Sequence, residues 1–156
     1  GKDSDFRCQL TIVGEGKMKG DLQELVEELG LQKIVLFVGA KPRSEAVEHL
    51  RTCDVVPILK TITGYGLSPM KFYEAMGAGC HVLATDVPHM NEDDPRCVTN
   101  VSFPLDINEI ADALIEFHNV LPEIRERRNE VANYALQNHS WETRIDTLIE
   151  GLRAVS

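Results

Sequence analysis

Residues 61–86 read TITGYGLSPMKFYEAMGAGCHVLATD, and this stretch decides the fold. A glycine-containing loop leads into a segment at about 69–78 whose apolar residues recur at helical spacing, and the β-branched run HVLAT (81–85) follows. Ser68 is a good N-cap and Pro69 a good first helical residue. The pattern therefore predicts a loop, a helix with a well-defined start, and a buried strand.

The same alternation of β-branched and amphipathic segments extends along the whole chain. Strands are expected at 7–13, 33–39, 54–60, 81–85 and 97–103, and helices at about 22–29, 43–52, 69–78, 107–117, from Pro122 onward, and at 141–152. Gly30 is expected to cap the end of the first of these helices, and Ser140 to be the N-cap of the last. The run KIVLFVG (33–39) is almost continuously apolar, which indicates a strand buried on both faces. Strands separated by helices favour a parallel sheet with right-handed crossovers, so the predicted fold class is three-layer, Rossmann-like α/β. Ligands of such sheets bind beyond the carboxyl ends of the strands.

Composition describes one ordinary globular domain. The chain has 156 residues, of which 43% are hydrophobic and 26% charged. A net charge of −9 argues against a nucleic-acid partner and against a broad anionic-membrane surface. One basic cluster, Arg125, Arg127 and Arg128, is interleaved with glutamates and is interpreted as a solvated helix face.

The cysteines predict neither a metal site nor a disulfide framework. Cys8, Cys53, Cys80 and Cys97 form no CxxC pair and have no histidine at ligand spacing, which disfavours zinc. Most of them lie in or beside apolar runs, where a free cysteine behaves as a small buried hydrophobe. With no run of eighteen apolar residues, direct membrane insertion is not expected, and the chain is interpreted as cytoplasmic.

The helix start near Pro69 is a candidate anion site. Free N–H groups of a first helical turn, together with the helix dipole, attract anions, and Lys71 adds a cation within one turn. Glu74 would repel a phosphate at this point, but its carboxylate could accept hydrogen bonds from a ribose diol nearby. From these residues alone, a buried helix that follows a flexible loop is an equally good interpretation.

Four stretches together resemble the C-terminal, donor-binding domain of the GT-B glycosyltransferases, in particular the large retaining family 4. They are LTIVGEG (10–16), IVLFVGA (34–40) with CDVVPIL (53–59), GLSPMKFYEAMGAGCHVLATD (66–86) and NHSWETR (138–144). The third is similar to a subgroup whose helix begins Ser-Pro-x-Lys and continues to Glu-x-Met-x-x-Gly.

The resemblance implies a donor of the UDP- or GDP-sugar type and transfer of its sugar, with retention, to a glycan or lipid-linked acceptor in polysaccharide biosynthesis. It implies no metal and no other cofactor. Glu74 matches the second acid of the family's E-x7-E motif, which hydrogen-bonds the ribose hydroxyls. Backbone amides of Leu67 and Ser68 are expected to hold the diphosphate or the donor sugar, and amides from Gly66 to Ser68 to stabilise the leaving group.

Glycines of the first two strand ends are expected to complete the site. By the resemblance, Gly39 and Ala40 lie beside the nucleobase, while Gly14 and Gly16 line the floor of the cleft. Gly66 stands where the family has the first acid of E-x7-E, which usually touches the donor sugar.

The family also has an Arg and a Lys in a first strand and helix, and an N-terminal acceptor domain, that are expected before residue 1. The chain is therefore expected to be one domain of a longer enzyme, inactive alone, and at the inner membrane face through the missing domain. A non-catalytic nucleotide-binding module or a subunit of a split transferase is the alternative, which Gly66 favours.

Two weaker candidates complete the sequence survey. The spacing Gly14-x-Gly16-x-x-x-Gly20 after a strand invites an NAD(P) interpretation, but residues 38–41 (VGAK) lack the acid that should bind the ribose. His89 and Glu92 follow the strand at 81–85 and are candidates for donor contact, whereas His81, which begins that strand, is expected to be structural.

Overall fold

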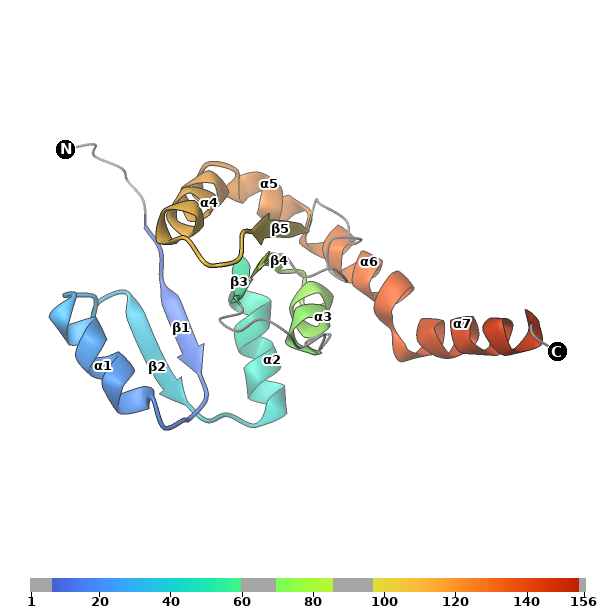
Figure 1. Ribbon diagram of the computed structural model, residues 1–156, viewed down its shortest axis with the longest axis horizontal. Coiled ribbons are helices and arrows are strands. Elements are labelled where there is room, and N and C mark those ends of the chain that lie inside the picture. Colours follow the sequence, from blue (N-terminus) through green and yellow to red (C-terminus); the bar gives the residue numbers. More distant parts are fainter. Residues whose placement is uncertain (1–6, 60–69, 86–96, 155–156) are drawn as a thin grey trace. The chain divides into compact units, whose positions relative to one another are not determined.

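The computed structural model describes residues 7–59, 70–85 and 97–154 (Figure 1). The chain divides into two compact units, Gly1–His49 and Leu50–Ser156. The boundary falls inside helix α2 (Arg43–Thr52), whose bounds match the sequence prediction.

The first unit contains one strand–helix–strand crossover. Strands β1 (Leu10–Val13) and β2 (Val35–Gly39) pair in parallel and are connected by α1 (Lys19–Glu28). As predicted, Gly30 ends the helical segment: its φ of +68° is easy for glycine, and Leu31 N–H donates to the Val26 carbonyl at 2.9 Å. The glycine that the sequence places after this helix therefore ends it in the structure.

The prediction that β2 is buried on both faces is wrong. Val35 is buried, but Leu36 is 39% exposed, and Ile34 just before the strand is 37% exposed. The reason is size, because a two-stranded sheet with one ten-residue crossover helix cannot cover both of its faces.

The second unit contains a three-stranded parallel sheet. Strands β3 (Val55–Ile58), β4 (His81–Thr85) and β5 (Val98–Val101) lie in the order β3-β4-β5, and α3 (Met70–Gly77) lies between β3 and β4 in the chain. Every strand pair is parallel, which confirms the predicted α/β class. Among the described residues, the ladders join β1 to β2 in the first unit and β3 to β4 and β5 in the second.

Helices cover both faces of this second sheet. The C-terminal helices are α4 (Ile107–Asn119), α5 (Leu121–Glu126), α6 (Arg128–His139) and α7 (Trp141–Ala154). One core cluster joins α3 and α6 to Val82 and Ala84 of β4, and the other joins α4 to Leu83. Because successive residues of β4 enter opposite clusters, the sheet is the middle of three layers and β4 is buried along its whole length.

The C-terminal third departs from the prediction at one point. The helix expected from Pro122 onward is two helices, α5 and α6, that meet at Arg127. The predicted cap of α7 is confirmed, since Ser140 Oγ accepts from the Thr143 N–H at 3.1 Å. Across residues 7–59, 70–85 and 97–154, no helix has the length and apolar character needed to cross a membrane.

Candidate functional site

Helix α3 carries the two charged candidates of the second unit. Phe72, Ala75 and Met76 are fully buried and fix one face of the helix in the core. On the rest of its surface Lys71 is exposed and Glu74 is half-buried. Three residues apart, they are neighbours on the helix surface, so a cation and a carboxylate lie within one turn of each other near the start of α3.

Part of the predicted site lies outside the described residues. Gly66, Leu67 and Ser68, which should form the amide cradle, fall in the undescribed segment 60–69. The same holds for His89 and Glu92, in segment 86–96.

In the first unit, the structure brings two of the predicted glycines together. The Gly14 N–H donates to the Gly39 carbonyl at 2.8 Å, which joins the ends of β1 and β2. Gly14 has φ +139° and Gly39 has φ +73°, conformations that other residues adopt at a cost. Gly16 and Ala40 follow in the exposed segments after the two strands.

Beside Gly39 lies a charged pair that the sequence survey missed. Glu15 Oε1 is 3.1 Å from where a Cβ at Gly39 would be, and it accepts a hydrogen bond from Lys19 Nζ at 2.8 Å. The i, i+4 spacing of the two residues was the available signal. Both side chains are partly exposed, so the pair contributes little to stability.

At its other end, α3 is closed by a tight glycine turn. The Cys80 N–H donates to the Ala75 carbonyl and the Gly79 N–H to the Met76 carbonyl, at 3.0 and 2.8 Å. This is the Schellman pattern, and Gly79 has the φ of +78° that it requires. A Cβ at Gly79 would lie 2.6 Å from the Arg128 carbonyl oxygen, so the turn packs directly on the backbone of α6.

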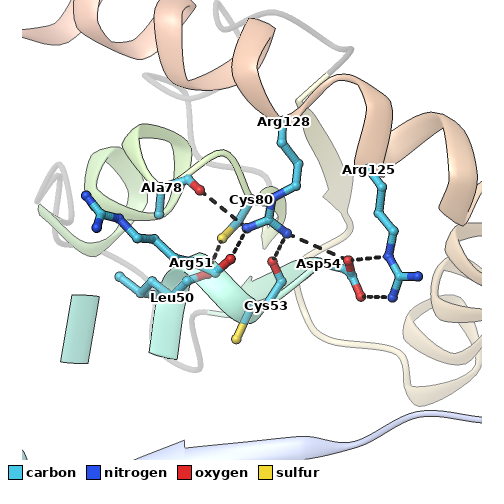
Figure 2. A network of polar contacts seen from close by, with 8 residues as sticks. All are labelled: Leu50, Arg51, Cys53, Asp54, Ala78, Cys80, Arg125 and Arg128. Atoms are coloured by element: carbon cyan, nitrogen blue, oxygen red, sulfur yellow. Dashed lines mark hydrogen bonds and ion pairs between the residues drawn. The ribbon is translucent and has the colours of Figure 1, made fainter. Parts of the chain in front are cut away.

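The interpretation of the basic cluster as a solvated face is wrong for Arg128, whereas Arg125 and Arg127 are exposed as expected. Figure 2 shows the Arg128 guanidinium surrounded by carbonyl oxygens of two segments, the stretch 51–53 and the turn at Ala78. It donates to the carbonyls of Cys53, at 2.7 Å, of Arg51, and of Ala78, at 3.4 Å.

Asp54 is the acid of this network. Arg125 Nε and Nη2 donate to its two carboxylate oxygens at 2.9 and 3.0 Å, and Arg128 Nη1 lies 3.7 Å from Oδ1. The bidentate hydrogen bond to Asp54 raises the pKa of Arg125. Spacing along one helix could not reveal these contacts, because the partners of Arg125 and Arg128 lie 50 to 77 residues away.

Cys80 and His81, where β4 begins, have structural roles. Burial raises the pKa of the Cys80 thiol to about 11, and the thiol donates to the Leu50 carbonyl at 3.0 Å. His81 Nε2 is 3.0 Å from Thr99 Oγ1, and its ring packs on Phe117 at 4.8 Å. A protonated, buried thiol is a poor nucleophile, and the expected structural role of His81 is confirmed.

The NHSWETR segment also holds α3. The ring of His139 lies 4.8 Å from that of Tyr73, and the Arg144 guanidinium carbon lies 4.8 Å from the centre of the same Tyr73 ring. The junction of α6 and α7 is thereby fixed against the residue that precedes Glu74.

Comparison with known proteins finds a family match and solved structures of similar fold. Residues 2–119 match the family described as "Glycosyl transferases group 1". A curated relative, alpha-monoglucosyldiacylglycerol synthase of Streptococcus pneumoniae, is 28% identical over 90 residues, which are 58% of this chain and 20% of that protein.

Solved structures of similar fold include Anabaena HepE in complex with UDP, with a TM-score of 0.73 and 20% identity over 94% of this chain and 41% of that one. Sucrose-phosphate synthase of Thermosynechococcus elongatus gives a TM-score of 0.71 and 21% identity over 95% of this chain and 39% of that one. The chain thus spans a fifth of the curated relative and about two fifths of these two solved proteins.

Proposed function

The chain belongs to the group 1 glycosyltransferases and has their GT-B type of fold, and from this premise we propose that it is the donor-binding domain of a retaining, family 4-like enzyme. In this proposal it binds a nucleotide-diphosphate sugar and, within a longer protein, transfers the sugar to a glycan or lipid-linked acceptor. The chain alone would bind the donor without completing the transfer.

The observation that carries the proposal is the placement on α3 of Lys71, which is exposed and close to the helix start, and Glu74, which is half-buried and one turn further along. A cation near a helix N-terminus suits a diphosphate, and a carboxylate one turn further along suits the vicinal hydroxyls of a ribose. In the proposal, Lys71 binds the phosphate and Glu74 accepts from the ribose.

The remaining contacts are proposed from the resemblance. Backbone amides at Gly66, Leu67 and Ser68 would hold the diphosphate. Because the leaving nucleotide gains charge as the glycosidic bond breaks, fixed amide donors there would stabilise the transition state more than the bound donor.

In the first unit, Gly39 and Ala40 would read the nucleobase, and Gly14 and Gly16 would allow close approach of the ligand. The mechanism needs no metal or other cofactor in this proposal. The solved relative that was crystallised with UDP and with UDP-glucose supports a uridine donor. Use of a nucleotide sugar and the free thiols fit a cytoplasmic location.

The test is a calorimetric titration of the chain with UDP, GDP and NAD. We expect a diphosphate to bind and NAD not to bind. Glu74→Ala should weaken UDP binding by roughly ten- to a hundredfold, the value of a hydrogen bond to a charged group. Glu116→Ala, an exposed glutamate of α4, is the matched control and should bind as the wild type does.

A second ligand separates the ribose contact from a general loss of binding. With 2′-deoxy-UDP the wild type should lose affinity and Glu74→Ala should lose less, because the removed hydroxyl is the partner of the removed carboxylate. Equal losses in both proteins would exclude Glu74 from the ribose.

Gly66 favours one alternative, a nucleotide-binding module that does not catalyse transfer. Without the first acid of E-x7-E, such a module would bind UDP and a UDP-sugar equally well. Tighter binding of one UDP-sugar than of UDP, or formation of a product by the longer protein, would decide for the enzyme.

A further inference from the structure

Arg128 contacts the end of α3 in two independent ways. Its guanidinium donates to the carbonyl of Ala78, the residue that follows the last turn of α3. Its own backbone oxygen faces Gly79 so closely that a Cβ there would lie 2.6 Å away. The side chain and the backbone of one α6 residue thus both fix the turn that ends α3.

A short relay connects this contact to the charged face of the helix. Ala78, whose carbonyl accepts from Arg128, donates its own N–H to the Glu74 carbonyl at 3.0 Å. A shift of Ala78 would therefore disturb the last turn of α3, where the carbonyls of Glu74 and Ala75 both accept from the Ala78 N–H. Because a helix moves as a rigid rod over two turns, the same movement also displaces Lys71.

The guanidinium also contacts the segment that leads into β3. It donates to the carbonyl of Arg51 in the last turn of α2 and to the carbonyl of Cys53 just before β3. Carbonyls at helix C-termini carry the negative end of the helix dipole, so one cation satisfies the ends of α2 and α3 together. Arg128 thus bridges the turn at the end of α3 and the segment that leads into β3 (Figure 2).

We propose that Arg128 is a positioning residue for donor binding: it holds the C-terminal end of α3 so that Glu74 and Lys71 meet the nucleotide correctly. The inference rests on the proposed function, and it adds a residue that touches neither nucleotide nor sugar. Arg125 shares the partner Asp54 but is 60% exposed, whereas the Arg128 side chain is 23% exposed and reaches the helix ends.

The experiment compares three variants of the full 156-residue chain. Arg128→Met removes the guanidinium but keeps the length of the side chain. Arg125→Met is the control for the loss of a cation from Asp54. Phe117→Leu is the control for lost stability, because Phe117 lies in the core cluster on the other face of the sheet from α3. Affinity for UDP and amide hydrogen exchange are measured well below each melting temperature.

We expect Arg128→Met to weaken UDP binding about tenfold, because displacement of a binding group by a fraction of an ångström has large effects. The amides of Gly79 and Cys80, which close the end of α3, should exchange faster in this variant without ligand. Both controls should bind UDP within about twofold of the wild type. Arg128→Lys keeps the charge but reaches one carbonyl at a time, so it should be intermediate, and it provides the same test if Arg128→Met does not fold.

Two results would overturn the inference, and only one of them also overturns the proposed function. If Arg128→Met, or Arg128→Lys in its place, binds UDP as Phe117→Leu does, the arginine is structural and the proposed function stands. If the wild-type chain binds neither UDP nor GDP, the proposed function fails and the positioning role fails with it.

Discussion

Gly79 offers a quantitative test of how α3 is joined to α6. Replacing it by Ala puts a side chain on a residue with φ +78°, which costs about 1–2 kcal/mol. The new Cβ would also lie 2.6 Å from the Arg128 oxygen, where ordinary contact begins at 3.4 Å. Removing that overlap means overpacking a buried joint, at about 1–3 kcal/mol. Because Ala has less conformational freedom than Gly in the unfolded chain, folding loses less entropy, and this offsets about 0.5 kcal/mol of the cost. The expected loss of unfolding free energy is therefore about 1.5–4.5 kcal/mol.

The assay is urea unfolding followed by circular dichroism, with two further variants that separate the causes. Gly77→Ala, two residues earlier, meets open space and should stabilise the chain by up to about 1 kcal/mol. Gly79→Asn relieves the backbone strain but keeps the collision, so it should be almost as unstable as Gly79→Ala. If Gly79→Ala were as stable as Gly77→Ala, or if Gly79→Asn were as stable as the wild type, the collision with Arg128 would not exist as described.

Three further outcomes follow from the second unit and the chain start. Burial raises the pKa of Cys80 from an ordinary 9.0 to about 11, so the stability that the protonated thiol contributes is complete below pH 9 and is lost as the pH rises toward 11. Over this interval the unfolding free energy of Cys80→Ala should therefore fall less than that of the wild type, by up to about 2–3 kcal/mol. Parallel curves for the two proteins would contradict the burial of the thiol. A disulfide reagent at neutral pH should modify the exposed Cys8 at once and the buried Cys80 and Cys97 at least about a hundredfold more slowly. The rates are measured by mass spectrometry, and similar rates for all three would mean that the core opens readily. Asp106→Ala removes the N-cap of α4, whose carboxylate accepts from the Asn108 N–H at 2.8 Å, and should lower the unfolding free energy in urea by about 1 kcal/mol. Asp112→Ala, at an exposed position within the same helix, should leave it unchanged, and equal effects of the two variants would exclude capping as the cause.

Local chemistry explains why most of the fold could be predicted. Gly30 and Ser140 specify their helix ends through their own backbone or side chain, and both predictions are confirmed. The run HVLAT is buried on both faces, as continuous apolar strands are, and its bounds are those of β4. The similar run at 33–39 gave a wrong prediction of burial. Burial depends on how many elements cover a sheet, and the hydrophobic pattern of one segment does not reveal how many there are.

The candidate site likewise contains residues that the sequence could place and residues that it could not. Lys71 and Glu74 follow from helical spacing within one segment, so the sequence could place them on one face of α3. The role of Arg128 could not be predicted, because its partners lie on two distant segments, 51–54 and the turn at Ala78, and a run of alternating charges usually faces water. Arg128 also lies beyond residue 119, where the family match ends.

The long sequence separation of these contacts has a consequence for folding. The hydrogen bonds of Arg128 close loops of 77, 75 and 50 residues, to Arg51, Cys53 and Ala78. Contacts of such high order form late, after local helices and the β3–β4 pairing are in place. On the ribosome, α3 is complete about fifty residues before the arginine that orients it has been added. The helix is thus made early and fixed in its final position last, so a chain that stops short of α6 would contain α3 without the means to orient it.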